Sequence, residues 1–142
     1  MLASTYSQLM TDATEHGQFP LRDFLGMELS GDGPGRGTAA VDITDKHHNP
    51  NGVVHGAVLF ALVDTAMGKA TMSVLGEGVF CATIEISLRF IRPVSSGTVL
   101  AEATVLKRGR HVVHLDARIQ DSEDRLIATA DGTFAIIDGT PR

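Results

Sequence analysis

An aspartate, Asp64, lies in the middle of the apolar run GAVLFALVDTAMG, which spans residues 56–68. A carboxylate inside a hydrophobic helix costs several kcal/mol unless it is hydrogen-bonded, paired with a cation or used in a reaction. Such a group can act as a general base toward water, or it can attack a carbonyl carbon itself. The alternative is a buried structural acid that accepts a hydrogen bond from a hydroxyl such as that of Thr65 or Thr83.

A second reactive feature is the start of the helix that carries Asp64, which we expect near His55 and Gly56. Free backbone N–H groups at a helix start stabilise a developing oxyanion, and a glycine lets a ligand approach closely. Asp64 follows Gly56 by eight residues, which is about 12 Å along a helix axis. One reacting carbon must lie close to both groups. If both are catalytic, Gly56 of one subunit must therefore face Asp64 of another across a two-fold axis.

Three histidines, His47, His48 and His55, precede or begin this helix. They form no i, i+4 pair and have no cysteine partner, so we expect no metal site. Two roles are open for His55: fixing the loop through its ring hydrogen bonds, or taking a direct part in catalysis. Asn49 stands before a proline, which is typical of a residue that starts a turn.

The elements around these residues follow from hydrophobic periodicity. An amphipathic helix is expected at about 3–15, and residues 24–44 are expected to form two strands joined by a turn at 31–37. That glycine-rich turn lacks the Lys-Ser/Thr ending of a phosphate-binding loop. A long helix at about 56–75 is apolar nearly all round, as an enclosed helix should be. Four strand-like segments follow, at 80–91, 98–107, 111–120 and 125–137.

Short connections between these strands favour antiparallel neighbours. The order of elements predicts an α+β fold, with an antiparallel sheet of five to six strands wrapped around a long central helix. Within residues 80–91, strict alternation puts Ile84, Ile86 and Phe90 on the apolar face. The same alternation puts Cys81 on the polar face, where we expect it to be inert.

Composition narrows the class of protein. The chain has 142 residues, 43% of them hydrophobic, so we expect one domain over residues 1–142. A net charge of −5 argues against general nucleic-acid binding. Asp64 and Lys69 interrupt the longest apolar stretch, which argues against a membrane span. The single cysteine and the absence of a signal-peptide pattern predict a cytoplasmic location.

The segment HNPNGVVHGAVLFALVDTAMG, with TIEISLRFIRP after it, resembles the hotdog-fold acyl-CoA thioesterases. The resemblance is to the phenylacetate-degradation (PaaI-like) branch, whose pattern is H-x-N-x-x-G-x-x-H-G-G followed by L-x-D-x-A. In element order it covers about residues 20–138. It implies a helix wrapped by a sheet, dimers joined edge to edge and often paired into tetramers, and hydrolysis of acyl-CoA without a metal or redox cofactor.

The resemblance also implies roles for single residues. Asp64 matches the catalytic carboxylate, and Gly56 matches the oxyanion-hole N–H. Asn49 matches a loop amide that orients water or thioester, Thr83 a hydroxyl beside the carboxylate, and His55 the histidine that precedes the helix. The second glycine of the usual His-Gly-Gly is Ala57 here, and its methyl group could narrow the acyl channel.

Coenzyme A carries phosphates, whereas this chain is net negative, so basic residues must gather locally. The candidates stand at strand ends and in the KRGR turn: Arg89, Arg92, Lys107, Arg108, Arg110 and His111. An ordinary solvated hairpin turn explains them equally well.

Two other functions fit a hotdog domain. One is an enoyl-thioester hydratase or dehydratase, which needs a histidine and an acid placed at the substrate's α and β carbons. The other is a non-catalytic acyl-CoA-binding protein, which normally carries an effector domain. The sequence leaves the acyl group open between phenylacetyl, hydroxylated aromatic and medium-chain aliphatic thioesters, and it does not choose between dimer and tetramer.

Overall fold

The computed structural model describes residues 18–31 and 33–138, so the helix expected at 3–15 lies outside the described residues. Nine elements occur in the described part of the chain. In order they are α2 (Pro20–Leu25), β1 (Glu28–Ser30), β2 (Arg36–Asp42), a 3₁₀ turn (Asp45–His47), α3 (Gly56–Met72), β3 (Val79–Phe90), β4 (Thr98–Arg108), β5 (Val112–Gln120) and β6 (Leu126–Asp138).

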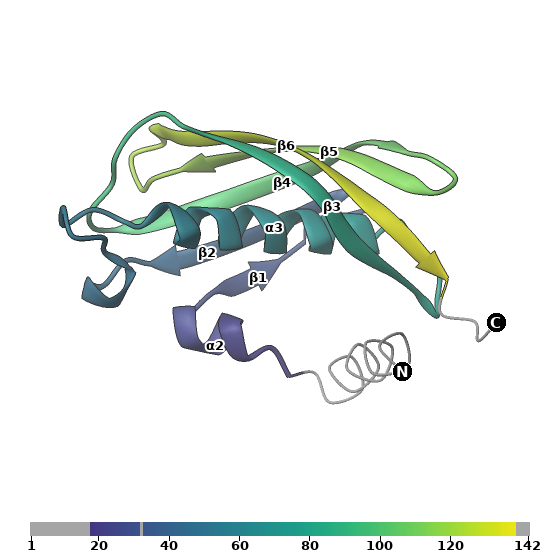
Figure 1. Ribbon diagram of the computed structural model, residues 1–142, viewed down its shortest axis with the longest axis horizontal. Coiled ribbons are helices and arrows are strands. Elements are labelled where there is room, and N and C mark those ends of the chain that lie inside the picture. The colour runs from purple at the N-terminus through teal and green to yellow at the C-terminus, as the bar shows by residue number, and fades with distance from the viewer. Residues whose placement is uncertain (1–17, 32, 139–142) are drawn as a thin grey trace.

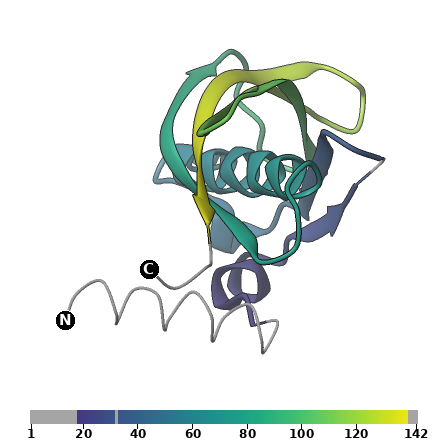
Figure 2. The same cartoon turned by 90° about the vertical axis from the view of Figure 1, so that its right-hand side faces the viewer.

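The six strands form one antiparallel sheet in the order β1-β2-β4-β5-β6-β3. The sheet curls around α3, which runs through its concave side (Figures 1 and 2). The predicted α+β architecture of a strongly curved sheet around one long helix is therefore confirmed. Strand β3 forms one edge of the sheet and pairs only with β6 among the described strands. No helix in the described part of the chain is long and apolar enough to cross a membrane.

The core lies between the sheet and the buried face of α3, where Leu62, Val63 and Met67 are fully buried. Two glycines let strands approach this helix closely. A Cβ atom at Gly37 would overlap the Ala66 carbonyl oxygen, and one at Gly132 would overlap the Met67 sulfur. Close packing of this kind holds α3 at a fixed depth in the sheet, because interiors tolerate little added volume.

The N-terminal part of the described chain differs from the prediction. Residues 20–25 form α2, whereas the sequence pattern predicts a strand from residue 24. Pro20 occupies the first turn of α2, and Gly26 ends it with a left-handed φ of 75°. Proline at the start and glycine just past the end stabilise even a short helix. The long helix α3 ends at Met72, three residues before the predicted end at 75.

A β-bulge interrupts β3 between Thr83 and Glu85, where the register with β6 shifts. Before the bulge, Cys81 and Thr83 face α3, with the Cys81 sulfur next to the Gly68 carbonyl oxygen. Past the bulge, Ile86 and Phe90 face α3 instead. The prediction that Cys81 lies on the polar face is therefore wrong, because a bulge reverses the alternation of a strand.

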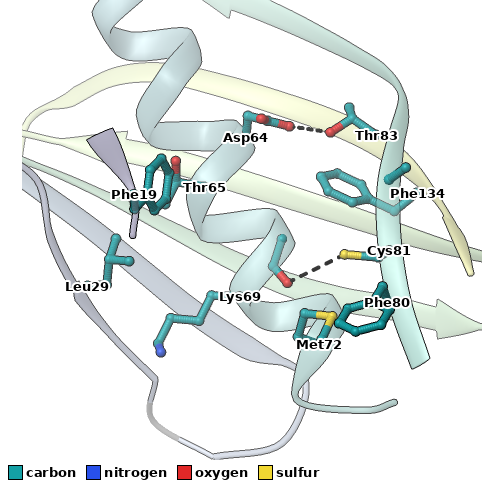
Figure 3. A pocket seen from close by; sticks show the side chains of 12 residues that line it. Phe19, Leu29, Asp64, Thr65, Lys69, Met72, Phe80, Cys81, Thr83 and Phe134 are labelled. Carbon is teal, nitrogen blue, oxygen red and sulfur yellow. Dashed lines mark hydrogen bonds between the residues drawn. The ribbon is translucent and has the colours of Figure 1, made fainter. Parts of the chain in front are cut away.

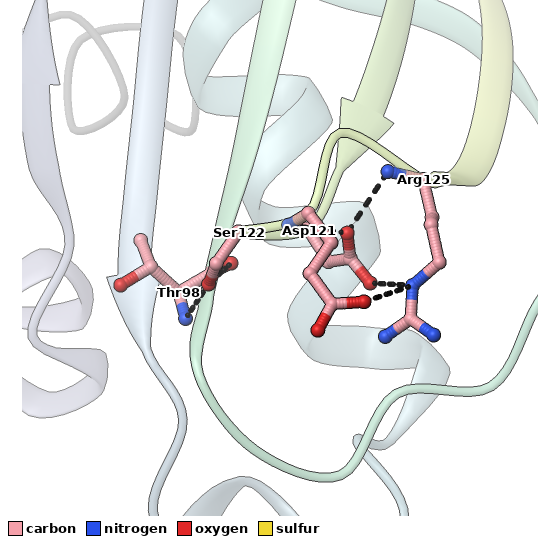
Figure 4. Close-up of polar contacts among 5 residues, drawn as sticks. Thr98, Asp121, Ser122 and Arg125 are labelled. Atoms are coloured by element: carbon pink, nitrogen blue, oxygen red, sulfur yellow. Dashed lines mark hydrogen bonds and ion pairs between the residues drawn. The ribbon is translucent and has the colours of Figure 1, made fainter.

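A polar turn fixes the connection between β5 and β6 (Figure 4). Asp121 accepts hydrogen bonds from the Glu123 and Arg125 backbone N–H groups, both at 2.9 Å, and its second oxygen pairs with Arg125 Nε at 2.7 Å. Next to it, Ser122 Oγ accepts from the Thr98 N–H at 3.1 Å, which ties the turn to the start of β4. The turn is a structural feature at the surface of the sheet.

Candidate active site

Asp64 lines a cavity of about 790 Å³ between α3 and β3 (Figure 3). Its carboxylate points toward β3, where Thr83 Oγ1 donates a hydrogen bond of 2.5 Å to Asp64 Oδ1. The other oxygen, Oδ2, has no hydrogen-bond partner among the described residues. Asp64 is only half-buried, so its charge can be kept at modest cost while one oxygen stays available to a ligand.

The rest of this cavity is mostly apolar. Met72, Phe80 and Phe134 lie below Asp64, toward the C-terminal end of α3 (Figure 3). Cys81 also lines it, and burial, together with the nearby negative charge of Asp64, raises the pKa of its thiol to about 11. A thiol held protonated is a poor nucleophile. Of these two groups, Asp64 is therefore the one suited to take a proton from water or to attack a carbonyl carbon.

The N-terminal end of α3 has a different geometry. His55 is the N-cap residue, and its Nδ1 accepts a hydrogen bond of 2.9 Å from the Ala57 N–H. Its side chain is thus engaged in capping the helix. The Gly56 N–H makes no hydrogen bond to any residue that the structure describes. A free N–H at the first turn of a 17-residue helix is suited to stabilise an oxyanion.

Gly56 lines a second cavity, of about 350 Å³, together with Asn49, Phe90 and Arg92. Asn49 Oδ1 accepts from the backbone N–H groups of Asn51 at 2.9 Å and Val53 at 3.4 Å. Asn49 therefore holds the turn, and its amide NH₂ group remains available to a ligand.

Among residues 18–31 and 33–138, none lines both cavities. The cavity between α3 and β3 holds Asp64 and Thr83, whereas the one at the start of α3 holds Gly56, Asn49 and Arg92. The separation agrees with the axial distance of about 12 Å predicted from the helix rise. Within one chain, the carboxylate and the candidate oxyanion donor cannot act on the same carbon.

The other two histidines have structural partners. His47 is buried, its Nδ1 accepts from the Thr44 N–H at 2.9 Å, and its Nε2 lies 2.8 Å from the Leu25 carbonyl oxygen. His48 Nε2 lies 2.8 Å from the Ser95 carbonyl oxygen. No group of three His, Cys, Asp or Glu side chains that could hold a metal ion occurs in residues 18–31 and 33–138.

One chain does not bring the predicted basic residues together. Arg92 lies beside Gly56, and Arg89 is exposed on β3. The others are in or next to the β4–β5 hairpin, at the opposite end of the sheet from the start of α3 (Figure 1). These hairpin residues are Lys107, Arg108, Arg110 and His111.

Phe90 is a residue of this site that sequence analysis missed. It ends β3, and a Cβ atom at Gly56 would lie 2.8 Å from its Cζ atom. Its place on the apolar face of a strand gives no sign of this contact, because the sequence does not show which end of α3 that strand crosses.

Comparison with known proteins places this geometry in a family. The thioesterase superfamily model matches residues 51–128, a segment that contains Gly56, Asp64 and Thr83. A thioesterase of Haemophilus influenzae has a TM-score of 0.81 at 30% identity, over 86% of this chain and 85% of that chain. A conserved protein of Pseudomonas aeruginosa has a TM-score of 0.81 at 31% identity, over 88% of this chain and 99% of that one.

The PaaI protein of the E. coli phenylacetic acid degradation operon has a TM-score of 0.81 at 23% identity, over 95% and 96% of the two chains. At that identity the likeness is one of fold alone. The family model and the two structures at 30% identity or above show the protein family as well as the fold. The chain belongs to the thioesterase superfamily and is a hydrolase with the hotdog fold.

Proposed function

We propose that this protein hydrolyses acyl-CoA thioesters at sites shared between two subunits, with Asp64 from one subunit and Gly56 from the other. The observation that carries the proposal is the free Gly56 N–H in a different cavity from the Asp64 carboxylate. The match to the thioesterase superfamily supports thioester hydrolysis as the reaction class. Together they call for a second chain to complete each site.

A two-fold axis near Phe60 would supply that chain. Phe60 lies midway between Gly56 and Asp64 and is 41% exposed although it is on a largely buried helix. Two antiparallel α3 helices crossing there would place Gly56 of each subunit opposite Asp64 of the other. The edge of β3 that pairs with no described strand can pair with its symmetry mate in the same arrangement. Pairing of such dimers into tetramers, in the cytoplasm, is part of the proposal.

The reaction follows from the chemistry of these groups. Asp64 Oδ2 takes a proton from water while the water oxygen forms a bond to the thioester carbonyl carbon. The carbonyl oxygen becomes an oxyanion, which accepts a hydrogen bond from the Gly56 N–H of the other subunit. Collapse of the tetrahedral intermediate re-forms the carbonyl and breaks the carbon–sulfur bond, and the thiolate leaves and takes up a proton. The free acid and coenzyme A are the products, and no metal or redox cofactor takes part.

A second route uses the same residues. The Asp64 carboxylate attacks the carbonyl directly and expels the thiolate, which gives an anhydride that water then hydrolyses. In either route Thr83 holds Asp64 Oδ1 through its hydrogen bond and leaves Oδ2 toward the substrate. The free amide group of Asn49 donates to the thioester or the water, and His55 supports the helix start by capping it.

Binding of the coenzyme A phosphates is assigned to the basic residues. Arg92 lines the same cavity as Gly56. Arg89 lies near the end of β3, before Arg92 in the chain. An antiparallel partner would bring its own β4–β5 hairpin, with Lys107, Arg108, Arg110 and His111, toward that end of the molecule.

The test is release of free thiol from a panel of phenylacetyl-, hydroxybenzoyl- and medium-chain acyl-CoAs. We expect wild type to release thiol from at least one, and Asp64→Asn to lose about 10²- to 10⁴-fold in rate. Asp116→Asn is the matched control, because Asp116 lies on the face of β5 that points away from α3. Binding without release would contradict the proposal in favour of a non-catalytic acyl-CoA-binding protein. Hydration of an enoyl-CoA without thiol release would contradict it in favour of a hydratase.

A further inference from the structure

Phe90 occupies an unusual position at the end of β3. Its ring lies so close to the helix start that a Cβ atom at Gly56 would be 2.8 Å from Cζ and 3.3 Å from Cε1. The side chain nevertheless remains 58% exposed. Unlike the exposed ring of Phe24, the ring of Phe90 lines the cavity that contains the Gly56 N–H, next to the 49% exposed Ile91, so its open surface is part of a candidate binding site.

The contacts between α3 and β3 occur at two levels. At one level Asp64 meets Thr83 through a hydrogen bond, and at the other Gly56 meets Phe90. The antiparallel arrangement proposed above places the Gly56 level of one subunit opposite the Asp64 level of the other. Because Phe90 contacts Gly56 of its own chain, this arrangement would place Phe90 next to the other subunit's Asp64 as well. The exposed surface of its ring would then lie toward the cavity that this Asp64 lines.

We infer that Phe90 contacts the substrate and forms the apolar wall of the site supplied in trans, over the carbonyl group held by the Gly56 N–H. This inference rests on the proposed function. The ring excludes water from one side of the N–H, and a hydrogen bond to an oxyanion is stronger where water is excluded. The ring also contacts the first carbons of the acyl chain, so the site favours acyl groups that are apolar next to the carbonyl over those that carry a charge there.

The first test compares Phe90→Ala with Phe24→Ala. The control removes the same ring from a residue that is 68% exposed on α2 and lines neither cavity. We expect Phe90→Ala to lower kcat/KM for apolar acyl-CoAs by about tenfold or more, since apolar contacts in a substrate pocket have effects of this size. We also expect a smaller loss for substrates charged at the α-carbon. Phe90→Leu keeps an apolar side chain, so its kcat/KM should lie between those of wild type and Phe90→Ala. This variant replaces Phe90→Ala in the test if the alanine variant does not fold.

The second test determines whether Phe90 acts together with Asp64 of its own subunit or with Asp64 of the other subunit. Phe90→Ala chains are co-expressed with Asp64→Asn chains, and mixed dimers are isolated by two different tags. A ring acting in trans leaves each mixed dimer with one wild-type site, so activity per Phe90→Ala chain rises above that of the Phe90→Ala dimer. A ring acting beside its own Asp64 leaves that activity unchanged, which would overturn the inference.

The outcomes separate the two proposals. If wild type hydrolyses acyl-CoA, Asp64→Asn does not, and Phe90→Ala behaves like Phe24→Ala, the inference about Phe90 is wrong while the proposed function stands. If wild type releases thiol from none of the thioesters, the proposed function fails and the inference fails with it.

Discussion

Replacing Gly56 by proline removes one candidate catalytic group, the N–H, and keeps the backbone conformation of the helix start. The Gly56 N–H has no partner among the described residues, so proline deletes no hydrogen bond within that part of the chain. Gly56 is the first residue of α3, where proline is well tolerated. The preceding residue, His55, has φ −65° and ψ 138°, an extended conformation that a following proline favours. We therefore expect Gly56→Pro to fold with nearly wild-type stability.

The expected loss of activity follows from the role of one oxyanion donor. Removing a single donor of this kind lowers kcat by about 10²- to 10³-fold. Proline also adds a side chain, whose Cβ meets the ring of Phe90 at 2.8 Å. Gly56→Ala adds the same Cβ but keeps the N–H, so it measures the steric effect alone. Because the close contact falls on the far end of a side chain that is 58% exposed and can shift, we expect Gly56→Ala to lose far less activity than Gly56→Pro.

The assay is continuous detection of free thiol on the best acyl-CoA, with thermal unfolding of both variants as a check of the fold. The ratio of the two kcat values isolates the N–H. Equal activities for folded Gly56→Pro and Gly56→Ala would refute the reasoning, because the oxyanion would then have another donor.

Three further predictions test the shared site, the cavity and the fold. Mixing inactive Asp64→Asn and Gly56→Pro chains at equal amounts should restore about a quarter of wild-type activity, because half of the dimers are mixed and each has one intact site; no recovery in verified mixed dimers would place both groups in one subunit. Cys81, with its thiol pKa raised to about 11 by burial and by Asp64, should react slowly with iodoacetamide at neutral pH, and Asp64→Asn should speed this reaction as measured by mass spectrometry. Burial raises the pKa of Asp121, but hydrogen bonds from Arg125 and Glu123 outweigh this effect and lower the pKa from its ordinary value of 3.8. The Asp121 carboxylate therefore stabilises the fold fully above its unfolded-state pKa, and this stabilisation is lost as the pH falls through the lowered folded-state pKa. Thermal unfolding between about pH 2 and 5 should show a smaller loss of stability on acidification for Asp121→Asn than for wild type.

The parts of the fold that local patterns determine were predictable. The apolar segment from Gly56 onward predicts the enclosed helix, and alternation predicts the long strands, because both signals repeat within one element. Asp64 stands out for the same local reason, as a charge in an apolar helix. The distance between Gly56 and Asp64 needs only the helix rise, so the separation of the two groups was predictable as well.

The features that depend on contacts between distant segments were not predictable. The bulge at Thr83 leaves no mark in the alternation of β3, so the side on which Cys81 lies was predicted wrongly. The contact of Phe90 with Gly56 requires knowing how β3 crosses α3. The partner of the buried His47 ring, the Leu25 carbonyl oxygen, lies 22 positions earlier in the chain, so local spacing does not indicate it. Such partners are set by the tertiary fold and not by local spacing.

The extra residue in β3 makes the number of residues in that strand part of the reactive geometry. Thr83 and Phe90 are seven positions apart, so in a regular strand their side chains would point to opposite sides of the sheet. In this strand both side chains point toward α3. Loss of one residue between them would turn one of the two side chains away. Side chains along β3 can therefore be exchanged to alter substrate range, whereas an insertion or deletion between these two positions would dismantle the site.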